Sequence, residues 1–221
     1  MNSQTEENYL KALFNLADPN GEVSISDLSN QLEVSTPTVN SMIKKLHEKN
    51  LVEYQKYKPI KLTKEGKKTA ALIIRKHRLT EMFLVENMGF GWEEVHEIAE
   101  QIEHIQSSKF FDRMDELVGY PSVDPHGSPI PDKKGNIVQK EYQILSKCRQ
   151  GDKIWLVALR HSSSEFLNFL NNRDLSLDTK IRILSIEEFD GSMVVEYNGR
   201  KETLSKTVCD KLMVEKKSEK A

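Results

Sequence analysis

The sequence has few cysteines and no long apolar run, and both shortages narrow the class of protein. Only Cys148 and Cys209 occur among 221 residues, and no CxxC motif is present. This argues against a disulfide scaffold and against a thiolate zinc site, and it fits a reducing cytoplasm. No stretch of about 18 apolar residues exists, so no membrane span is expected. The polar, acidic N-terminus does not resemble a secretory signal.

The net charge is only −2, which at first sight argues against nucleic-acid binding, but the charges are segregated along the chain. Residues 40–78 carry twelve Lys or Arg and three acidic residues, a balance of +9. Residues 79–118 carry two basic and ten acidic residues, a balance of −8. A basic part therefore adjoins an acidic part. Basic surfaces attract phosphate, and acidic surfaces attract cations.

The basic part has the pattern of a winged helix-turn-helix. Residues 5–17 predict an amphipathic helix, and residues 24–32 predict a short helix that Ser24 or Ser26 could cap. A second helix is expected over residues 35–46, with Pro37 in its first turn. Two helices joined by a short turn are typical of helix-turn-helix proteins. Apolar–polar alternation over residues 51–63 predicts a two-stranded wing.

Small polar side chains on the first turns of the second helix can approach base edges, and the lysines farther along can reach phosphates. The tip of the predicted wing adds further lysines. The candidate DNA contacts are Ser35, Thr36, Pro37, Thr38, Asn40, Ser41, Lys44, Lys45, Lys56 and Lys58. The alternative is a winged helix used only to bind another protein.

The acidic part predicts two long helices, from Thr63 to about Asn87 and from Trp92 to Leu117, separated by a break at Gly89-Phe90-Gly91. Each helix has an apolar side that must be buried. Two such helices per chain suit a helical dimer interface. A homodimer would also match the two-fold arrangement of operator half-sites.

Two helix faces in this part concentrate imidazole and carboxylate groups. They hold His77 and Glu81 on the first helix, and His96, Glu100, Glu103 and His104 on the second. At about 100° per residue, the members of each group share a face. Such donors suit a divalent transition metal, and carboxylates so close together repel unless a cation lies between them. The alternative is a solvated helix surface. The sequence HExxE differs from the HExxH of zinc proteases.

Seven segments in order resemble one known family. They are Thr5–Leu10, Ser35–Val39, Leu62–Gly66, Arg75–Glu81, Val95–His96, Glu100–His104 and Pro125–Pro131. Together they are similar to the diphtheria toxin repressor family of metal-dependent transcriptional repressors, which includes manganese transport regulators. The resemblance spans residues 5–131, and it implies operator DNA as the partner.

The resemblance implies metal ligands at defined positions. The regulatory site would use Asn8, Glu100, Glu103 and His104, and a second site would use His77, Glu81 and His96. In some relatives further ligands come from positions matching Asp124 and His126, or His161, Ser162 and Glu165. Asn8 stands where manganese-type members often have Asp. Lys11 replaces a glutamate that some members use in a binuclear site, which argues against such a site here. The oxygen and nitrogen donors favour Mn²⁺, with Fe²⁺ as the alternative.

The rest of the chain predicts an ordered linker and a small β domain. Residues 119–135 contain four prolines, which favours a linker. Strands are expected at 153–159 and 180–186, a short helix at 164–170, and tight hairpins at 189–192 and 197–200. This region is similar to the SH3-like domain of longer family members. The fold class is therefore mainly α with a small β-barrel.

The expected organisation has a DNA-binding domain over 1–63, a helical metal-binding and dimerisation domain over 64–138, and an SH3-like domain over 139–221. The expected function is that of a cytoplasmic, homodimeric repressor that binds operator DNA when loaded with metal and controls metal-uptake genes. One alternative is a metal-independent winged-helix regulator or interaction module. Another is a metal-dependent hydrolase, but the sequence has no nucleophile elbow, P-loop or HExxH motif.

Overall fold

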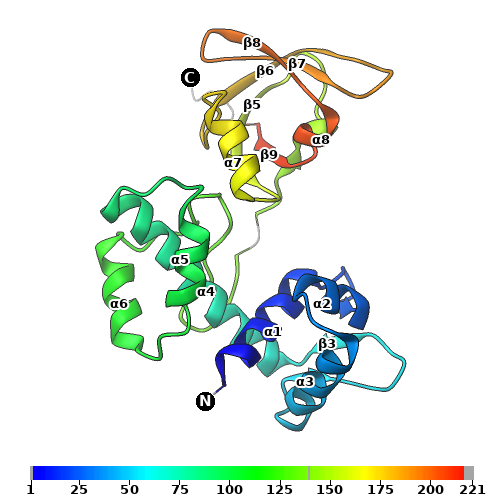
Figure 1. Ribbon diagram of the computed structural model, residues 1–221. Helices are drawn as coiled ribbons and strands as arrows, with labels where there is room; N and C mark the ends of the chain where they lie inside the picture. Colours follow the sequence, from blue (N-terminus) through cyan, green and yellow to red (C-terminus); the bar gives the residue numbers. More distant parts are fainter. Residues whose placement is uncertain (1, 139, 217–221) are drawn as a thin grey trace. The chain divides into compact units, whose positions relative to one another are not determined.

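The computed structural model describes residues 2–138 and 140–216 of the chain. They form two compact units, whose elements are labelled in Figure 1. The first unit contains the residues up to 83, 97–122 and 130–138, and the second contains 84–96, 123–129 and the residues from 139 onward. The division into three domains at 63/64 and 138/139 stays a prediction. Within the described ranges, no helix is long and apolar enough to cross a bilayer.

The N-terminal helices confirm the predicted helix-turn-helix. They are α1 (Gln4–Leu16), α2 (Ile25–Gln31) and α3 (Thr36–Glu48), which gather beside β3 in Figure 1. Each begins at a serine whose hydroxyl accepts a backbone N–H: Ser3, Ser24 and Ser35. These caps satisfy donors that would otherwise lack a partner at the helix start.

The wing has one strand more than the sequence predicts. Strands β2 (Val52–Glu53) and β3 (Ile60–Leu62) form the expected antiparallel pair. A third strand, β1 (Glu22–Val23), adds to the other edge of β3, giving the order β1-β3-β2. A core of fully buried side chains joins this sheet to the helices: Leu10, Leu28, Val39, Ile43, Leu46 and Ile60.

The acidic part contains three helices, so the prediction of one continuous helix from Trp92 to Leu117 was wrong. Helix α4 (Lys64–Met88) agrees with the first predicted helix. The second is divided into α5 (Val95–Ile102) and α6 (Ser108–Leu117). The break follows from Ser107, whose hydroxyl accepts the N–H of Phe110 and starts a new helix.

A buried ion pair fastens α6 and the following linker to α4. The Arg75 guanidinium lies 2.5 Å from a carboxylate oxygen of Asp115 and donates to the carbonyl of Pro131 at 2.7 Å. Around it, Leu79 of α4 packs with apolar side chains of α6 and the linker. Residues 130–138 therefore belong to the first unit, although they follow a linker-like sequence.

The second unit is built on a six-stranded antiparallel sheet with the order β4-β9-β5-β6-β7-β8. Its elements are β4 (Gln143–Ile144), η1 (Leu145–Lys147), β5 (Lys153–Leu159), α7 (Ser164–Asn171), β6 (Lys180–Ile186), β7 (Met193–Tyr197), β8 (Arg200–Leu204), α8 (Lys206–Cys209) and β9 (Leu212–Glu215). The predicted strands at 153–159 and 180–186, the helix and both hairpins are confirmed.

Both cysteines are buried in the core of this sheet domain. Burial raises the pKa of the Cys148 thiol and raises the pKa of Cys209 to about 12. They are free thiols, as the absence of a CxxC pattern predicts. The proline-rich turn 123–129 also belongs to this unit and is fastened to it by the Leu159 N–H, which donates to the carbonyl of His126 at 2.9 Å.

Gly66 allows α4 to start directly against the wing, and a side chain there should disturb that contact. A Cβ on Gly66 would lie 1.9 Å from the carbonyl oxygen of Leu51. We expect Gly66→Ala to lower the free energy of unfolding by about 1–3 kcal/mol, because overpacking forces backbone apart. Chemical denaturation measures it. The control is Glu65→Ala at the exposed neighbouring position. Equal stability of the two variants would show that α4 does not pack as described.

Candidate metal centre and DNA-binding surface

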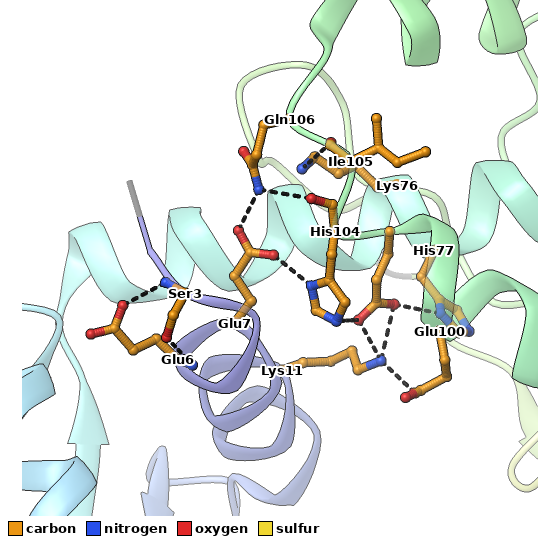
Figure 2. Close-up of polar contacts among 11 residues, drawn as sticks. Ser3, Glu6, Glu7, Lys11, Lys76, His77, Glu100, His104, Ile105 and Gln106 are labelled. Atoms are coloured by element: carbon orange, nitrogen blue, oxygen red, sulfur yellow. Dashed lines mark hydrogen bonds and ion pairs between the residues drawn. The ribbon is translucent and has the colours of Figure 1, made fainter.

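The best-defined polar cluster lies where α1 meets the end of α5, within the first unit. The Lys11 ammonium of α1 lies 2.5 Å from Glu100, and 2.7 and 3.0 Å from the two oxygens of Glu103. Figure 2 shows the Lys11 side chain extending toward Glu100. The Glu103 side chain is fully buried, so its negative charge lies in a low-dielectric environment that requires compensation.

A second contact between the same segments involves His104. Its Nδ1 lies 2.7 Å from a carboxylate oxygen of Glu7, and its Nε2 lies 3.7 Å from Glu103. The other oxygen of Glu7 accepts a hydrogen bond from Gln106 at 2.9 Å (Figure 2). Glu7 thus holds both the imidazole and the turn that carries it. The two contacts tie the first helix of the DNA-binding fold to residues 100–106.

His77 of α4 links this cluster to Glu81. Its Nδ1 lies 2.6 Å from Glu103, and its Nε2 lies 3.0 Å from Glu81. Burial disfavours the charged imidazole, but the bonds to the two carboxylates outweigh it and raise the pKa of His77 to about 9. One ligand atom from each of His77, Glu100 and Glu103 lies within 4.8 Å of the others, so this group could hold a metal ion.

The residues of the predicted regulatory site fit a hard divalent cation. The Oδ1 atom of Asn8 is buried and has no hydrogen-bond partner among the described residues. A buried acceptor without a partner is costly unless a ligand or ion satisfies it. Lys11, on the same helix, contacts the carboxylates of Glu100 and Glu103, and the His104 imidazole lies beside Glu103. Oxygen and nitrogen donors of this kind suit Mn²⁺ or Fe²⁺.

The residues of the predicted second site are divided between the units. His77 and Glu81 belong to the first, and His96, Asp124 and His126 to the second. His96 is exposed on α5. Asp124 is buried, and its Oδ1 accepts the N–H groups of His126 and Ser128. That His77, Glu81 and His96 form the second metal site, and that Asp124 and His126 supply further ligands, stays a prediction.

His126 has a well-defined place within the second unit. Its ring stacks on Trp92 with centroids 5.9 Å apart, and its Nε2 lies 2.9 Å from the carbonyl oxygen of Trp92. The indole N–H of Trp92 donates to Asn171 of α7 at 2.7 Å. The turn 123–129, the α4–α5 connection and α7 are therefore held together. His126 supports this packing whether or not it also binds metal.

The possible ligands from the C-terminal domain, His161, Ser162 and Glu165, all belong to the second unit. His161 and Glu165 are exposed beside the start of α7. Hydrogen bonds from the backbone at the start of α7 and from Ser163 lower the pKa of Glu165. In the described part of the chain, neither belongs to a group of three or more acidic, histidine or cysteine side chains that could hold an ion. Their role as ligands stays a prediction.

The candidate DNA contacts lie on an accessible surface formed by α3 and the wing. Asn40 is partly exposed and the other nine are exposed. The Asn40 amide donates to the carbonyl of Thr36, and its oxygen lies 3.5 Å from the Tyr54 hydroxyl. Tyr57 marks the wing tip, where it is 90% exposed and has a φ of 66°. Direct contact with DNA stays a prediction for all ten residues.

Helix α3, the candidate recognition helix, is also fastened to α1. The buried carboxylate of Glu6 lies 3.2 Å from the Lys45 ammonium and 2.8 Å from that of Lys49. It also accepts the backbone N–H of Ser3. Burial opposes ionisation of this group, but the lysines and the Ser3 N–H lower the pKa of Glu6 to about 2. Lys45 therefore holds the recognition helix in place, besides being a candidate phosphate contact.

The sequence pattern did not indicate that Glu7 belongs to this centre or that Lys11 is a cation within it. Spaced four apart on one helix, the two look like a local ion pair. Each instead contacts residues about a hundred positions later in the chain. Both residues lie within one helical turn of the predicted ligand Asn8, which was the available signal. Helical periodicity alone, however, does not show which residues pack against that part of α1.

Three protein-family models match successive parts of the chain. Residues 1–60 match the iron-dependent repressor N-terminal DNA-binding domain, and residues 63–132 match the iron-dependent repressor metal-binding and dimerisation domain. Residues 144–216 match the FeoA domain. A winged helix joined to a helical metal-binding domain defines a metal-responsive DNA-binding regulator, not an enzyme.

Individual relatives agree with this class. The chain is 31% identical to the HTH-type transcriptional regulator MntR of Oceanobacillus iheyensis over 65% of its own length and 96% of that relative. It is 32% identical to the iron-dependent repressor IdeR of Mycobacterium leprae, over 58% of its own length and only about half (55%) of that relative. A solved manganese-dependent transcriptional repressor in complex with manganese superposes with a TM-score of 0.85 at 31% identity, covering 95% of this chain and 98% of that one. The chain belongs to the diphtheria toxin repressor and MntR family of metal-dependent transcriptional repressors.

The contact between Glu7 and His104 gives a testable expectation for metal binding. A carboxylate that orients a ligating imidazole typically changes metal affinity 10- to 100-fold. We therefore expect Glu7→Ala to weaken Mn²⁺ binding by about that factor, measured by isothermal titration calorimetry. Gln106→Ala is the matched control, because it removes a partner of Glu7 but leaves the imidazole contact. If the two variants bind Mn²⁺ equally well, Glu7 does not position His104.

Proposed function

We propose that this chain is a homodimeric repressor, activated by Mn²⁺ with Fe²⁺ as the alternative, that binds operator DNA of metal-uptake genes in the cytoplasm. The observation that carries the proposal is the meeting of α1 with residues 100–106 around a buried cluster of oxygen and nitrogen donors. Asn8, Glu100, Glu103 and His104 would hold the ion. Mn²⁺ is favoured because three of these four donors are oxygens.

The bound ion would act by supplying positive charge at the junction between α1 and residues 100–106. Asn8 comes from α1, the first helix of the DNA-binding fold. Glu100 lies on α5, and Glu103 and His104 follow directly after its end. Because Glu6 joins α1 to the recognition helix, the position of α1 also determines that of α3. Metal and DNA must then strengthen each other's binding by the same factor. Moving the protein from mostly inactive to mostly active requires about 5.5 kcal/mol of preference for the competent form.

Dimerisation is supported by apolar side chains that remain uncovered on the helical part. Ile105, Phe110 and Leu117 are 39%, 42% and 50% exposed in the single chain. Their burial against a second copy would remove this apolar surface from water. A two-fold dimer would present two α3 helices to half-sites about one DNA turn apart.

One observation favours a metal-independent regulator as the second candidate. Lys11 already joins α1 to Glu100 and Glu103 without any added ion. If that contact alone held the competent arrangement, DNA binding would not depend on metal. The hydrolase alternative finds no support, because the family consists of DNA-binding regulators.

The decisive experiment measures binding to the DNA upstream of the chain's own gene by fluorescence anisotropy. We expect tight binding with Mn²⁺ or, anaerobically, Fe²⁺, and loss of binding after EDTA treatment. Glu103→Gln and His104→Ala should each abolish the metal dependence, because the first removes the negative charge of a ligand and the second removes a ligand, and sedimentation should still show a dimer. Retention of the Mn²⁺ response in both variants would show that the ligands are assigned wrongly. Equal binding with and without EDTA would favour the metal-independent regulator.

The DNA-binding surface gives a separate expectation. Lys44 is exposed on α3, past its first turns. We expect Lys44→Ala to weaken binding about equally on different DNA sequences and to reduce the slope of log affinity against log salt by about 1, because one phosphate contact is lost. Lys109→Ala, an exposed lysine of α6, is the control. A salt slope unchanged by Lys44→Ala would exclude a phosphate contact at this position.

A further inference from the structure

Lys11 occupies the position from which a cation would bind the carboxylates of the regulatory site. Its ammonium reaches Glu100 and both oxygens of Glu103 within 3.0 Å. The Lys11 side chain is only 13% exposed, so these contacts are largely shielded from water. Three short contacts to two carboxylates make this more than a chance surface ion pair.

The buried carboxylate of Glu103 explains why a cation is needed at this position. A buried charge without a partner is strongly destabilising, whereas a paired one is tolerated. Besides Lys11, the groups facing Glu103 are the imidazoles of His77 and His104. Of the three, Lys11 lies within 3.0 Å of carboxylate oxygens of both Glu100 and Glu103. The metal-free centre therefore depends on Lys11 for much of its charge balance.

A metal ion bound by Glu100 and Glu103 would use the same oxygens that now accept from Lys11. We propose that Lys11 is a built-in competitor of the regulatory ion: its ammonium balances Glu100 and Glu103 in the metal-free protein and gives up these oxygens when the metal binds. This inference rests on the proposed metal site and adds a residue that sets its affinity. The stability of the metal-free protein and its affinity for metal would then be coupled through one side chain.

Two measurements on the full chain test the proposal: the melting temperature of the EDTA-treated protein, and Mn²⁺ affinity by titration calorimetry. Lys11→Met removes the ammonium but keeps a long side chain. We expect it to lower the melting temperature of the metal-free protein and to tighten Mn²⁺ binding by roughly tenfold, within the usual range of such couplings. Lys11→Arg keeps the positive charge, so its metal-free melting temperature should stay near that of the wild type.

A matched control separates direct competition from a general change in charge. Lys76 lies near the cluster in Figure 2, but its ammonium donates to the carbonyl of Ile105 at 3.1 Å. Lys76→Met changes the net charge by the same amount and should leave Mn²⁺ affinity nearly unchanged. An equal gain of affinity in Lys76→Met and Lys11→Met would overturn the proposal. So would a Lys11→Met protein with wild-type affinity, or with an unchanged metal-free melting temperature.

Failure of the proposed function would give a different pattern. If the wild type does not bind Mn²⁺ but Lys11→Met does, Lys11 competes as inferred, and the metal dependence of the natural protein is wrong. If neither binds Mn²⁺, both ideas fail. If the wild type binds Mn²⁺ and responds to it on DNA, while Lys11→Met binds no more tightly, only the role of Lys11 is refuted.

Discussion

The buried carboxylate of Glu103 needs nearby positive charge to offset the cost of its burial. The packing of α1, α4 and the turn after α5 around it meets this need. Lys11 approaches from α1 and His77 from α4, while His104 lies beside it. Three segments far apart in sequence are thereby brought to one point. Because the charge is enclosed, each partner matters far more than it would at a surface.

Helix α1 has contacts in two directions, one toward α3 and one toward the turn after α5. Through Glu6 it holds two lysines at the end of the recognition helix. Through Glu7 and Lys11 it holds the turn after α5. A change in the charge balance around Glu100 and Glu103 would alter the contacts of α1 with them. Helix α3 is attached to α1 through Glu6, so it would be affected by the same change. A short helix thus connects the acidic centre to α3.

The sequence predicted elements whose signals are local. Capping serines and apolar periodicity located α1 to α4, and alternation located the wing and the main strands. The predicted helix from Trp92 to Leu117 failed because its apolar periodicity continues across the break that Ser107 creates. The two-residue strand β1 is too short to leave a pattern.

The candidate centre was predictable only in part, for a similar reason. Imidazoles and carboxylates on one helix face pointed to a cation, and the family resemblance pointed to Asn8. The positions of Glu7 and Lys11 depend on how α1 packs against the end of α5. No spacing within α1 encodes that long-range contact.

The two thiols of the sheet domain have a consequence for how the protein can respond to oxidants. The chain contains only Cys148 and Cys209, both lie in the core, and both are held in the protonated form by burial. The thiolate, not the thiol, is the nucleophile that attacks peroxide, so these protonated sulfurs react poorly while the domain is folded. The two cysteines of the folded domain are therefore poorly suited to act as sensors of oxidative stress.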